Sequence, residues 1–486
     1  MKLFIPENLD LDLILSLYPP VEIENFKKDY LIYILHLIKS IPATNKDLVI
    51  VEGFVPIYSK ILQRKVRNYR QYLDYLIYNS RVLETDNNYL VGCYSKGYRV
   101  IPKYNSQKVK PTRIYDRSLI AAIRRESRFP LTTKNKYKHL IKWFNEDLQI
   151  DYDLAMSFIE DDLARKLANP DLRDYDKKAR EYKDPYNQYN CAALNIERIA
   201  SGQFMLSIDA NVYRMHSVLT NLRSEVRNCL SYAGQPVVSI DIKNSQPYMS
   251  TGILKSSFWI DNRNIGKNQP KGGFDFSIYN ISESLLWEIF CNKSQIISYI
   301  MLCKYAESIA GSDLQRFSNL VQKGVFYEYL ADEIGRELGV EYSDRKKVKA
   351  AVFQVLFTDN RFLRQEEAQP KRIFRDKFPF VYKLFSLIKR QHKSNLPRLL
   401  QRIESHLMLL VVTKRIARER PDLPIFTIHD SIVTTVGNEI YVSEVLKQEL
   451  DKAIGCPPQV SLDYWTPSNL KFNDGIMFLG DIRLIV

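Results

Sequence analysis

Short apolar runs lead into acidic side chains at two places that lie far apart in the chain. Residues 237–240 read Val-Val-Ser-Ile and are followed by Asp241 and a polar stretch that reaches Pro247. This pattern predicts a buried strand that carries one carboxylate at its end, where the chain turns into a helix. Residues 425–435 place the pair His429–Asp430 between two apolar runs, which predicts a hairpin with the polar pair at its bend.

An aspartate at a strand end also suits an ordinary turn or a helix cap. Asp241 and Asp430 are so distant in sequence that only the fold can bring them together. If it does, their carboxylates are suited to hold two divalent cations about 3.5–4 Å apart, which is the arrangement for in-line phosphoryl transfer. We therefore expect two Mg²⁺ ions here, with Mn²⁺ as a possible substitute.

A third stretch has helical spacing. Residues 343–358 place Arg345, Lys349, Phe353 and Phe357 four positions apart, which puts them on one slowly drifting stripe of a helix. Two cations followed by two aromatic rings suit a triphosphate followed by a stacked base. The alternative is a solvated basic end that runs into an aromatic end facing the core.

In this order, the three stretches resemble motifs A, B and C of the family A DNA polymerases and of their relatives, the single-subunit phage-type RNA polymerases. Motif A begins with the metal-binding aspartate, here Asp241, and motif C carries His-Asp, here His429–Asp430. Motif B reads Arg-x3-Lys-x7-Tyr-Gly, and this chain has Phe357 and Thr358 in place of the last two residues.

A fourth stretch, residues 213–222, also matches. The polymerase group has a Gly-Arg pair and an Asn-Leu pair before motif A, and this chain has Tyr213–Arg214 and Asn221–Leu222. Tyr213 stands where the glycine would be. The resemblance covers roughly residues 200–470.

The resemblance implies an α+β fold of the right-hand polymerase type, with an antiparallel palm sheet and helical fingers and thumb. A chain of 486 residues is too long for one compact core, so two or three domains are expected. We expect an N-terminal helical or winged-helix-like domain at 1–105, a basic connector at 106–145, thumb-like helices at 146–200, palm parts at 201–254 and 399–486, and fingers at 255–398.

The same resemblance implies roles for individual residues. Asp241 and Asp430 would be the catalytic, metal-binding pair. The nucleotide would contact Arg345, Lys349, Phe353, Phe357 and Gln246. Primer or template would contact Arg214, Asn221, Gln401 and His429, and Glu404 is an alternative to Gln401 on the helix before motif C.

The choice of sugar is open. Gln246 stands where family A DNA polymerases have a glutamate that blocks the ribose 2′-hydroxyl, and it is bulky enough to act as a gate. Phe353 also matches the DNA enzymes, whereas Ser431 after His-Asp matches the RNA enzymes.

On balance, the resemblance favours a DNA polymerase, which is a nucleotidyltransferase. No spaced carboxylates before residue 200 suggest an exonuclease, so proofreading is not expected. A single-subunit RNA polymerase or primase is the first alternative, and a non-catalytic nucleic-acid-binding protein on this fold is the second.

The N-terminal part has its own pattern. Two helices are expected between Val55 and Tyr78, the second running from Ile61 with basic residues among aromatics. Asp86-Asn-Asn then marks a hairpin turn between two apolar strands. Helices followed by a hairpin resemble a winged-helix module, whose second helix would touch a duplex or a partner. A small helical cap with a solvated basic face fits the same pattern.

Charge and composition agree with a polyanionic partner. The net charge is +14, and residues 96–145 interleave cations with aromatics, as template handling requires. Arg124, Arg125 and Arg128 are the candidate template contacts there, although a linker with a solvated helix is the alternative.

The apolar run near 407–412 is too short to cross a bilayer, and the first residues lack a signal peptide's apolar core. Six isolated cysteines suit a reducing cytoplasm. Expected partners are therefore template, primer and nucleoside triphosphates, with no membrane, in an oligomeric state that the sequence leaves open.

Overall fold

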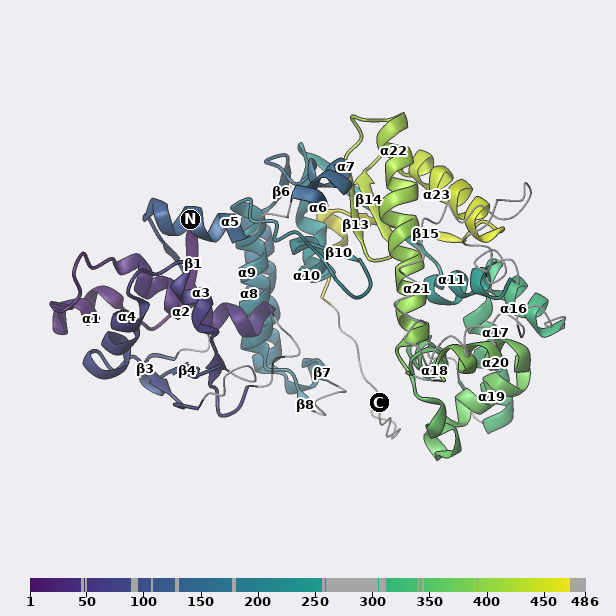
Figure 1. The fold of residues 1–486 in the computed structure, drawn as a ribbon, viewed down its shortest axis with the longest axis horizontal. Helices are drawn as coiled ribbons and strands as arrows, with labels where there is room; N and C mark the ends of the chain where they lie inside the picture. The colour runs from purple at the N-terminus through teal and green to yellow at the C-terminus, as the bar shows by residue number, and fades with distance from the viewer. Residues whose placement is uncertain are drawn as a thin grey trace, which may run out of the picture.

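The computed structural model of the chain is a mixed α/β structure with an antiparallel sheet at its centre (Figure 1). It describes residues 1–472 except 45–47, 49, 89–94, 106–107, 127–130, 177–180, 256–257, 259–304, 306–311, 340, 343–344 and 391. Its buried apolar residues form three clusters: one in the N-terminal elements, one beside the central sheet, and one that joins the sheet to a helical group at the far end. Within the described residues, no helix has both the length and the apolar character needed to cross a membrane.

The central sheet is built around one long strand, β12 (Gln235–Ile242). Its neighbours on the sheet path are β14 and β11, and β15 also pairs with it; every pairing is antiparallel. The remaining strands are β6 (Leu148–Ile150), β11 (Leu230–Tyr232), β13 (Ile425–Ile428), β14 (Ser431–Thr435) and β15 (Val460–Trp465). Residues 237–240 are buried on both faces of β12, as their continuous apolar run predicts.

The predicted hairpin is present. β13 and β14 pair with Ile428 opposite Ser431, so His429 and Asp430 form the two-residue bend. His429 has a φ of +55°, which a tight hairpin turn requires and which costs most residues free energy. β14 then pairs with β12 so that Ser431 lies opposite Asp241.

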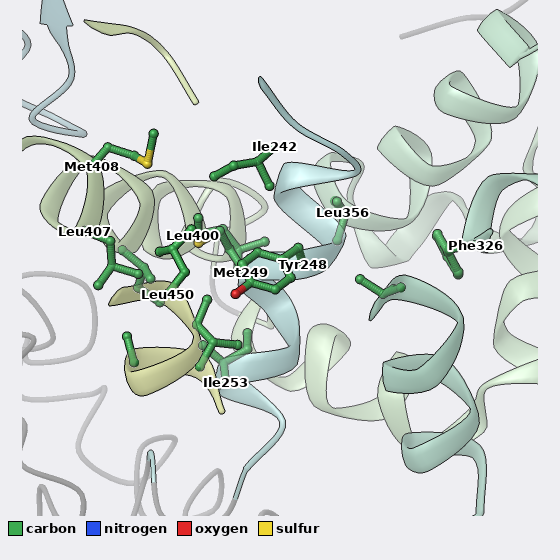
Figure 2. Packing of buried hydrophobic residues seen from close by; sticks show 14 of the residues in the cluster. Ile242, Tyr248, Met249, Ile253, Phe326, Leu356, Leu400, Leu407, Met408 and Leu450 are labelled. Carbon is green, nitrogen blue, oxygen red and sulfur yellow. The ribbon is translucent and has the colours of Figure 1, made fainter. Parts of the chain in front are cut away.

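A long helical stretch lies between the sheet and the far helical group, as the sequence predicts a long helix before the hairpin (Figure 1). It consists of α21 (Asn395–His406), the π-helical turn η8 (Leu407–Val412) and α22 (Thr413–Glu419). Figure 2 shows its apolar side, including Leu400 and Leu407, packed with Tyr248, Met249 and Ile253 of α11 (Ser245–Ile253). Fully burying a side chain of this size contributes roughly 1.5–3 kcal/mol. This packing fixes the helix that begins just after Asp241.

The helical group at the far end contains α16 (Ser312–Gln322), α17 (Phe326–Leu338), α18 (Arg345–Phe357), α19 (Gln369–Lys377) and α20 (Pro379–Ile388). Its interior is aromatic: the Phe317 ring makes edge contacts with Phe326, Phe378 and two further phenylalanines. α23 (Glu439–Ile454) packs on β12 and β14 of the sheet and on η8.

The N-terminal elements are β1 (Lys2–Pro6), α1 (Leu11–Leu17), α2 (Lys28–Thr44), β2 (Val55–Pro56), α3 (Ser59–Gln63), α4 (Tyr69–Asp74), the π-helical turn η1 (Tyr75–Asn79), β3 (Leu83–Thr85) and β4 (Gly97–Val100). The expected second helix starting at Ile61 is divided, because Asn68 has a φ of +55° and interrupts it. The strand expected directly after the Asp86-Asn-Asn turn falls within residues 89–94, outside the described residues, and β3 pairs with β4, which begins at Gly97.

Two segments differ from the expected division of the chain. The segment 106–145, expected to be a connector, contributes β5 (Val109–Arg113), which pairs with β1 along five residues. It also forms α5 (Arg117–Glu126), α6 (Leu131–Lys136) and α7 (Lys138–Ile141). The segment 146–200, expected to be purely helical, contains α8 (Tyr152–Ala168) and α9 (Pro185–Ala200), but it begins with β6, which joins the central sheet. Such pairings between distant strands leave no local mark in the sequence.

Candidate functional site

Asp241 and Asp430 are brought to adjacent strand ends of the central sheet. Asp241 lies opposite Ser431 in the β12–β14 ladder, and Asp430 directly precedes Ser431. The Ser431 hydroxyl donates a hydrogen bond to Asp241 Oδ1. Both aspartates are partly exposed, so their carboxylates line an accessible face at the sheet edge.

The charges around Asp241 are mostly negative. Burial raises the pKa of Asp241, and the negative charges of Asp430 and of Asp463 on β15 raise it further, while the Ser431 hydrogen bond and the positive charge of Arg227 lower it. Repulsion between carboxylates is what a bound cation would relieve. Hard carboxylate oxygens are also the ligands that Mg²⁺ prefers, so this pair of residues fits such an ion. Within the described residues, no cluster of three or more His, Cys, Asp or Glu side chains suited to a metal is found.

Glu404 on α21 is the centre of a buried polar cluster. Only 1% of its side chain is exposed, and its Oε1 accepts hydrogen bonds from Arg214 Nε at 2.9 Å and Arg214 Nη2 at 2.6 Å. Its Oε2 accepts from Ser245 Oγ at 3.2 Å and from Gln246 Nε2 at 2.6 Å. Burial raises the pKa of Glu404 to about 7, against the opposing effect of Arg214. One carboxylate therefore holds Arg214 and the first two residues of α11 in fixed positions.

The replacement of glycine by tyrosine at position 213 is accommodated with a left-handed backbone. Tyr213 has a φ of +57°, a conformation that glycine adopts at little cost and that L-residues rarely adopt. The Arg402 guanidinium lies 5.0 Å from the centre of the Tyr213 ring, and its Nε donates to the Asn211 carbonyl at 2.6 Å. These contacts stabilise the turn that presents Arg214.

The predicted stripe on α18 is present over the residues whose side chains are described. Lys349 is exposed, with its Nζ 5.6 Å from the centre of the Phe353 ring, and the Phe353 and Phe357 rings are 5.1 Å apart in an edge contact. The opposite face of the helix is buried: Val352, Val355 and Leu356 line a small packing void together with Pro247 and Ser250 of α11. The stripe thus lies on a helix whose buried face lines the same void as α11, the helix that follows Asp241. Arg345 begins α18, and its side chain lies outside the described residues.

Thr358 directly follows α18, and buried lysines hold this end of the helix. Two buried lysines donate to the last turn of α18: Lys371 Nζ reaches Thr358 Oγ1 at 3.0 Å, and Lys389 Nζ reaches the Val355 carbonyl at 2.5 Å and the Thr358 carbonyl at 3.1 Å. Burial lowers the pKa of Lys371 to about 8 and that of Lys389 to about 7. The lysines satisfy carbonyls that a glycine-based cap would otherwise satisfy.

The other predicted site residues are less closely grouped. His429 is exposed at the hairpin bend, with its ring centre 6.2 Å from that of His216. Gln401 is half-buried on α21, one turn before Glu404, and Asn221 is exposed at the end of α10 (Val218–Asn221). Arg124 is exposed on α5, the Arg125 side chain is outside the described residues, and so is Arg128 altogether.

Three residues that act on the site were not among the candidates predicted from the sequence, or stood there only as an alternative. Glu404 stood only as an alternative to Gln401, and Arg227 and Asp463, whose charges act on Asp241, were not considered. A spacing of three residues places Gln401 and Glu404 on nearby faces of α21, so helical periodicity alone does not choose between them. The extreme burial of a glutamate becomes visible only in three dimensions.

Comparison with known proteins gives a likeness in structure but none in sequence. No protein-family model matches the chain, and no curated protein matches it. Among solved structures, the chain is similar to the POL domain of Pol1 from M. smegmatis in complex with DNA primer-template and dNTP. The identity is 10% and the TM-score 0.32, with 73% of each chain covered.

The exposed basic helix α5 allows a test of the template contacts expected near it. Replacing Arg124, Arg125 and Arg128 with Ala should weaken binding of single-stranded template and flatten the dependence of log K on log salt by about 0.7 per lost phosphate contact. Fluorescence anisotropy over a salt series would measure both. An unchanged slope would mean that these residues form an ordinary solvated surface.

Proposed function

We propose that the chain is a template-directed nucleic acid polymerase that transfers nucleotidyl groups to a 3′-hydroxyl, and that it acts on deoxynucleotides without proofreading. The observation that carries this proposal is the meeting of three distant segments. Asp241 and Asp430 lie at adjacent strand ends, and the cation–aromatic stripe of α18 lies on a helix whose buried face shares a void with α11. A strand-end carboxylate pair beside such a helix suits a triphosphate whose base stacks on an aromatic ring.

In this proposal the fold is divided into palm, fingers and thumb, as in right-hand polymerases. The central sheet is the palm, α16–α20 belong to the fingers, and α8 and α9 form a thumb-like element that grips the product duplex. Nucleic acid template, primer and nucleoside triphosphates are the partners.

Asp241 and Asp430 would hold the metal ions. Mg²⁺ bound there would lower the pKa of the primer hydroxyl and neutralise the charge that develops on the phosphates. Ser431 orients Asp241 through its hydrogen bond to Oδ1, which leaves the other carboxylate oxygen for the cation. Two variants of this pair are discussed below.

The remaining residues would position the substrates. Lys349, with Arg345 one turn earlier, would neutralise the triphosphate, and Phe353 and Phe357 would pack beside the incoming base and its template partner. Arg214 is held by Glu404 with 20% of its side chain exposed, and this fixed guanidinium would contact the primer end. His429, Asn221 and Gln401 would contact primer or template further out.

The proposal is tested by extension of a labelled primer on a defined template. We expect extension with Mg²⁺ and deoxynucleotides, its loss on chelation by EDTA, and its recovery with Mg²⁺ or Mn²⁺. The same assay with ribonucleotides, and without primer, separates a DNA polymerase from an RNA polymerase or primase. Absence of extension under every condition, with template still bound, would favour a non-catalytic nucleic-acid-binding protein.

One observation favours the RNA polymerase as second candidate. Gln246 Nε2 is committed to Glu404, while its buried Oε1 has no hydrogen-bond partner in the described part of the chain. A free acceptor at this position suits a ribose 2′-hydroxyl. Against it stands the bulk of the side chain, which Glu404 holds rigidly and which suits a steric gate.

Substitution of Gln246 shows whether this side chain blocks the ribose 2′-hydroxyl or accepts a hydrogen bond from it. If Gln246 is a gate, Gln246→Gly should raise ribonucleotide incorporation relative to deoxynucleotide incorporation by roughly 5- to 200-fold. A buried hydroxyl without a partner costs about 1–3 kcal/mol, and about 1.4 kcal/mol is a factor of ten. Single-nucleotide extension with each sugar measures this ratio, with Gln448→Gly on α23 as a matched control.

Two other results of the Gln246→Gly experiment would contradict a steric gate. A fall in ribonucleotide use in Gln246→Gly would mean that Oε1 accepts the 2′-hydroxyl. No change in a protein that already prefers ribonucleotides would mean that Gln246 takes no part in sugar choice. In either case, the chain would belong with the RNA polymerases.

A further inference from the structure

The N-terminal elements follow one specific topological order. Helix α2 is followed by strand β2, by helices α3 and α4, and then by strands β3 and β4, and the three strands form an antiparallel sheet in the order β2–β4–β3. This is the order of a helix-turn-helix with a β-hairpin wing behind it. In that module the second helix of the pair, here α4 with its continuation η1, is the one that enters a groove of nucleic acid.

One face of this helix is anchored in the N-terminal core. Tyr72, Leu73 and Leu76 are buried, and the Tyr72 ring makes an edge contact with Tyr30 of α2 at 5.3 Å. The Tyr75 hydroxyl donates to the Tyr18 carbonyl at 2.6 Å. The helix is therefore held rigidly on the side away from solvent.

The opposite face is a polar stripe, which we call the α4 stripe: Arg67, Arg70, Gln71, Asp74 and Tyr78. All five are exposed, Tyr78 to 65%. The spacing of Arg70, Gln71, Asp74 and Tyr78 places them on one side of the helix, and Arg67 lies in the turn just before it. Arg67, Arg70 and Gln71 also line an open hollow of about 520 Å³ at the start of the helix. Arginine, glutamine and aspartate are side chains that read base edges by hydrogen bonding.

The surroundings of the stripe are positively charged. Residues 59–81 contain six basic side chains and one acidic one, a net charge of +5. Lys60 and Arg64 are exposed on α3 and directly after it, where the first helix of such a pair crosses the backbone. No ion pair to Arg64, Arg67 or Arg70 occurs among the described residues. Arg70 Nε donates a long hydrogen bond of 3.5 Å to the Tyr69 hydroxyl, at an exposed position where a phosphate or base can compete for the guanidinium.

From this placement we infer that the α4 stripe binds the major groove of double-stranded DNA and recognises its sequence. A major groove about 12 Å wide in B-form DNA admits an α-helix, whereas the deep, narrow groove of A-form RNA does not. Arg70 and Gln71 would contact bases, and Arg64 would contact a phosphate. This gives the chain a duplex-binding site separate from the sheet-edge aspartates, independent of whether those aspartates catalyse nucleotidyl transfer.

The test is selection of bound duplexes from a random-sequence library by the full chain carrying Asp241→Asn, which keeps any synthesis out of the readout. We expect a short enriched sequence. Arg70→Ala and Gln71→Ala should each lower affinity for that sequence by roughly 5- to 150-fold and relax the preference at one position. Arg64→Ala should weaken binding to all duplexes alike and reduce the salt slope by about one.

Controls separate this site from the rest of the molecule. Removing two exposed cations elsewhere, by Arg418→Ala and Lys447→Ala, should leave the enriched sequence and its affinity unchanged. Circular dichroism checks that each variant is folded, which the exposure of the stripe favours. No enriched sequence, equal affinity in the stripe variants, or preferential binding of single strands or RNA duplexes would each overturn the inference. Failure of the polymerase proposal would instead be seen in primer extension alone.

Discussion

Asp241→Asn and Asp430→Asn are each expected to reduce primer extension by about a thousandfold or more while leaving affinity for primer-template nearly unchanged. A cation held by two carboxylates supplies several kcal/mol of charge stabilisation in the transition state, and each 1.36 kcal/mol is a factor of ten in rate. Template binding instead depends on many distributed cations in a chain of net charge +14. Single-turnover extension and anisotropy, measured on the same preparation, give the two quantities.

The structure adds a second expectation that separates lost catalysis from lost folding. Burial and the neighbouring carboxylates raise the pKa of Asp241, so its ionised form is disfavoured in the folded chain. Asp241→Asn removes that charge and can still accept the Ser431 hydrogen bond. We therefore expect a thermal midpoint at neutral pH at or above that of the unaltered protein, together with the loss of extension.

Asp463→Asn provides the matched control. This carboxylate is exposed on β15, its Oδ2 accepts from Trp465 Nε1 at 2.9 Å, and its negative charge acts on Asp241 from a distance. The variant should retain most of the extension activity. Near-normal turnover in Asp241→Asn or Asp430→Asn would contradict the proposed two-metal site.

The sequence predicted the elements whose signals are local. Three such signals are the apolar run before Asp241, the polar pair His429–Asp430 between two apolar runs, and the four-residue spacing on α18. The structure has the corresponding strand, hairpin and helix. The meeting of Asp241 and Asp430 was expected through the resemblance, and the β12–β14 register places them at adjacent strand ends.

What the sequence did not predict depends on distant partners. β6 joins the central sheet through β11, and β5 pairs with β1 although a connector was expected there. Strand pairing at long range is set by burial and twist across the whole fold, and short edge strands carry weak patterns. The Glu404 cluster is of the same kind, because its hydrogen bonds span 158 to 190 residues.

The Glu404 cluster gives the second prediction with a large expected effect, which concerns the stability of the fold. Arg214→Met should destabilise the fold far more at high pH than at low pH, whereas the cost of Glu404→Leu should be nearly constant between pH 7 and pH 9. The asymmetry arises because Glu404 is 1% exposed while Arg214 is 20% exposed. Losing Arg214 leaves a buried carboxylate with only Ser245 and Gln246 as donors; losing Glu404 leaves a guanidinium that water can reach. Breaking a buried pair in this way typically costs about 3–5 kcal/mol.

The pH dependence follows from the pKa of Glu404, which burial raises to about 7 in the folded chain. A raised carboxyl pKa means that the folded state holds the proton more tightly than the unfolded state. This contribution to stability is complete below about pH 4 and is lost as the pH rises to about 7. Without Arg214, the folded pKa rises further, so the loss continues above pH 7 at up to about 1.4 kcal/mol per pH unit.

Denaturant unfolding of Arg214→Met, Glu404→Leu and the double variant at pH 6 to 9 measures these terms. The deficit of Arg214→Met relative to the unaltered protein should widen by up to about 3 kcal/mol between pH 7 and pH 9. The double variant should recover much of that loss, because it removes the stranded carboxylate and replaces the pair with apolar side chains. A deficit of Arg214→Met that stays constant with pH would show that Glu404 remains ionised without its arginine, held by Ser245 and Gln246 alone.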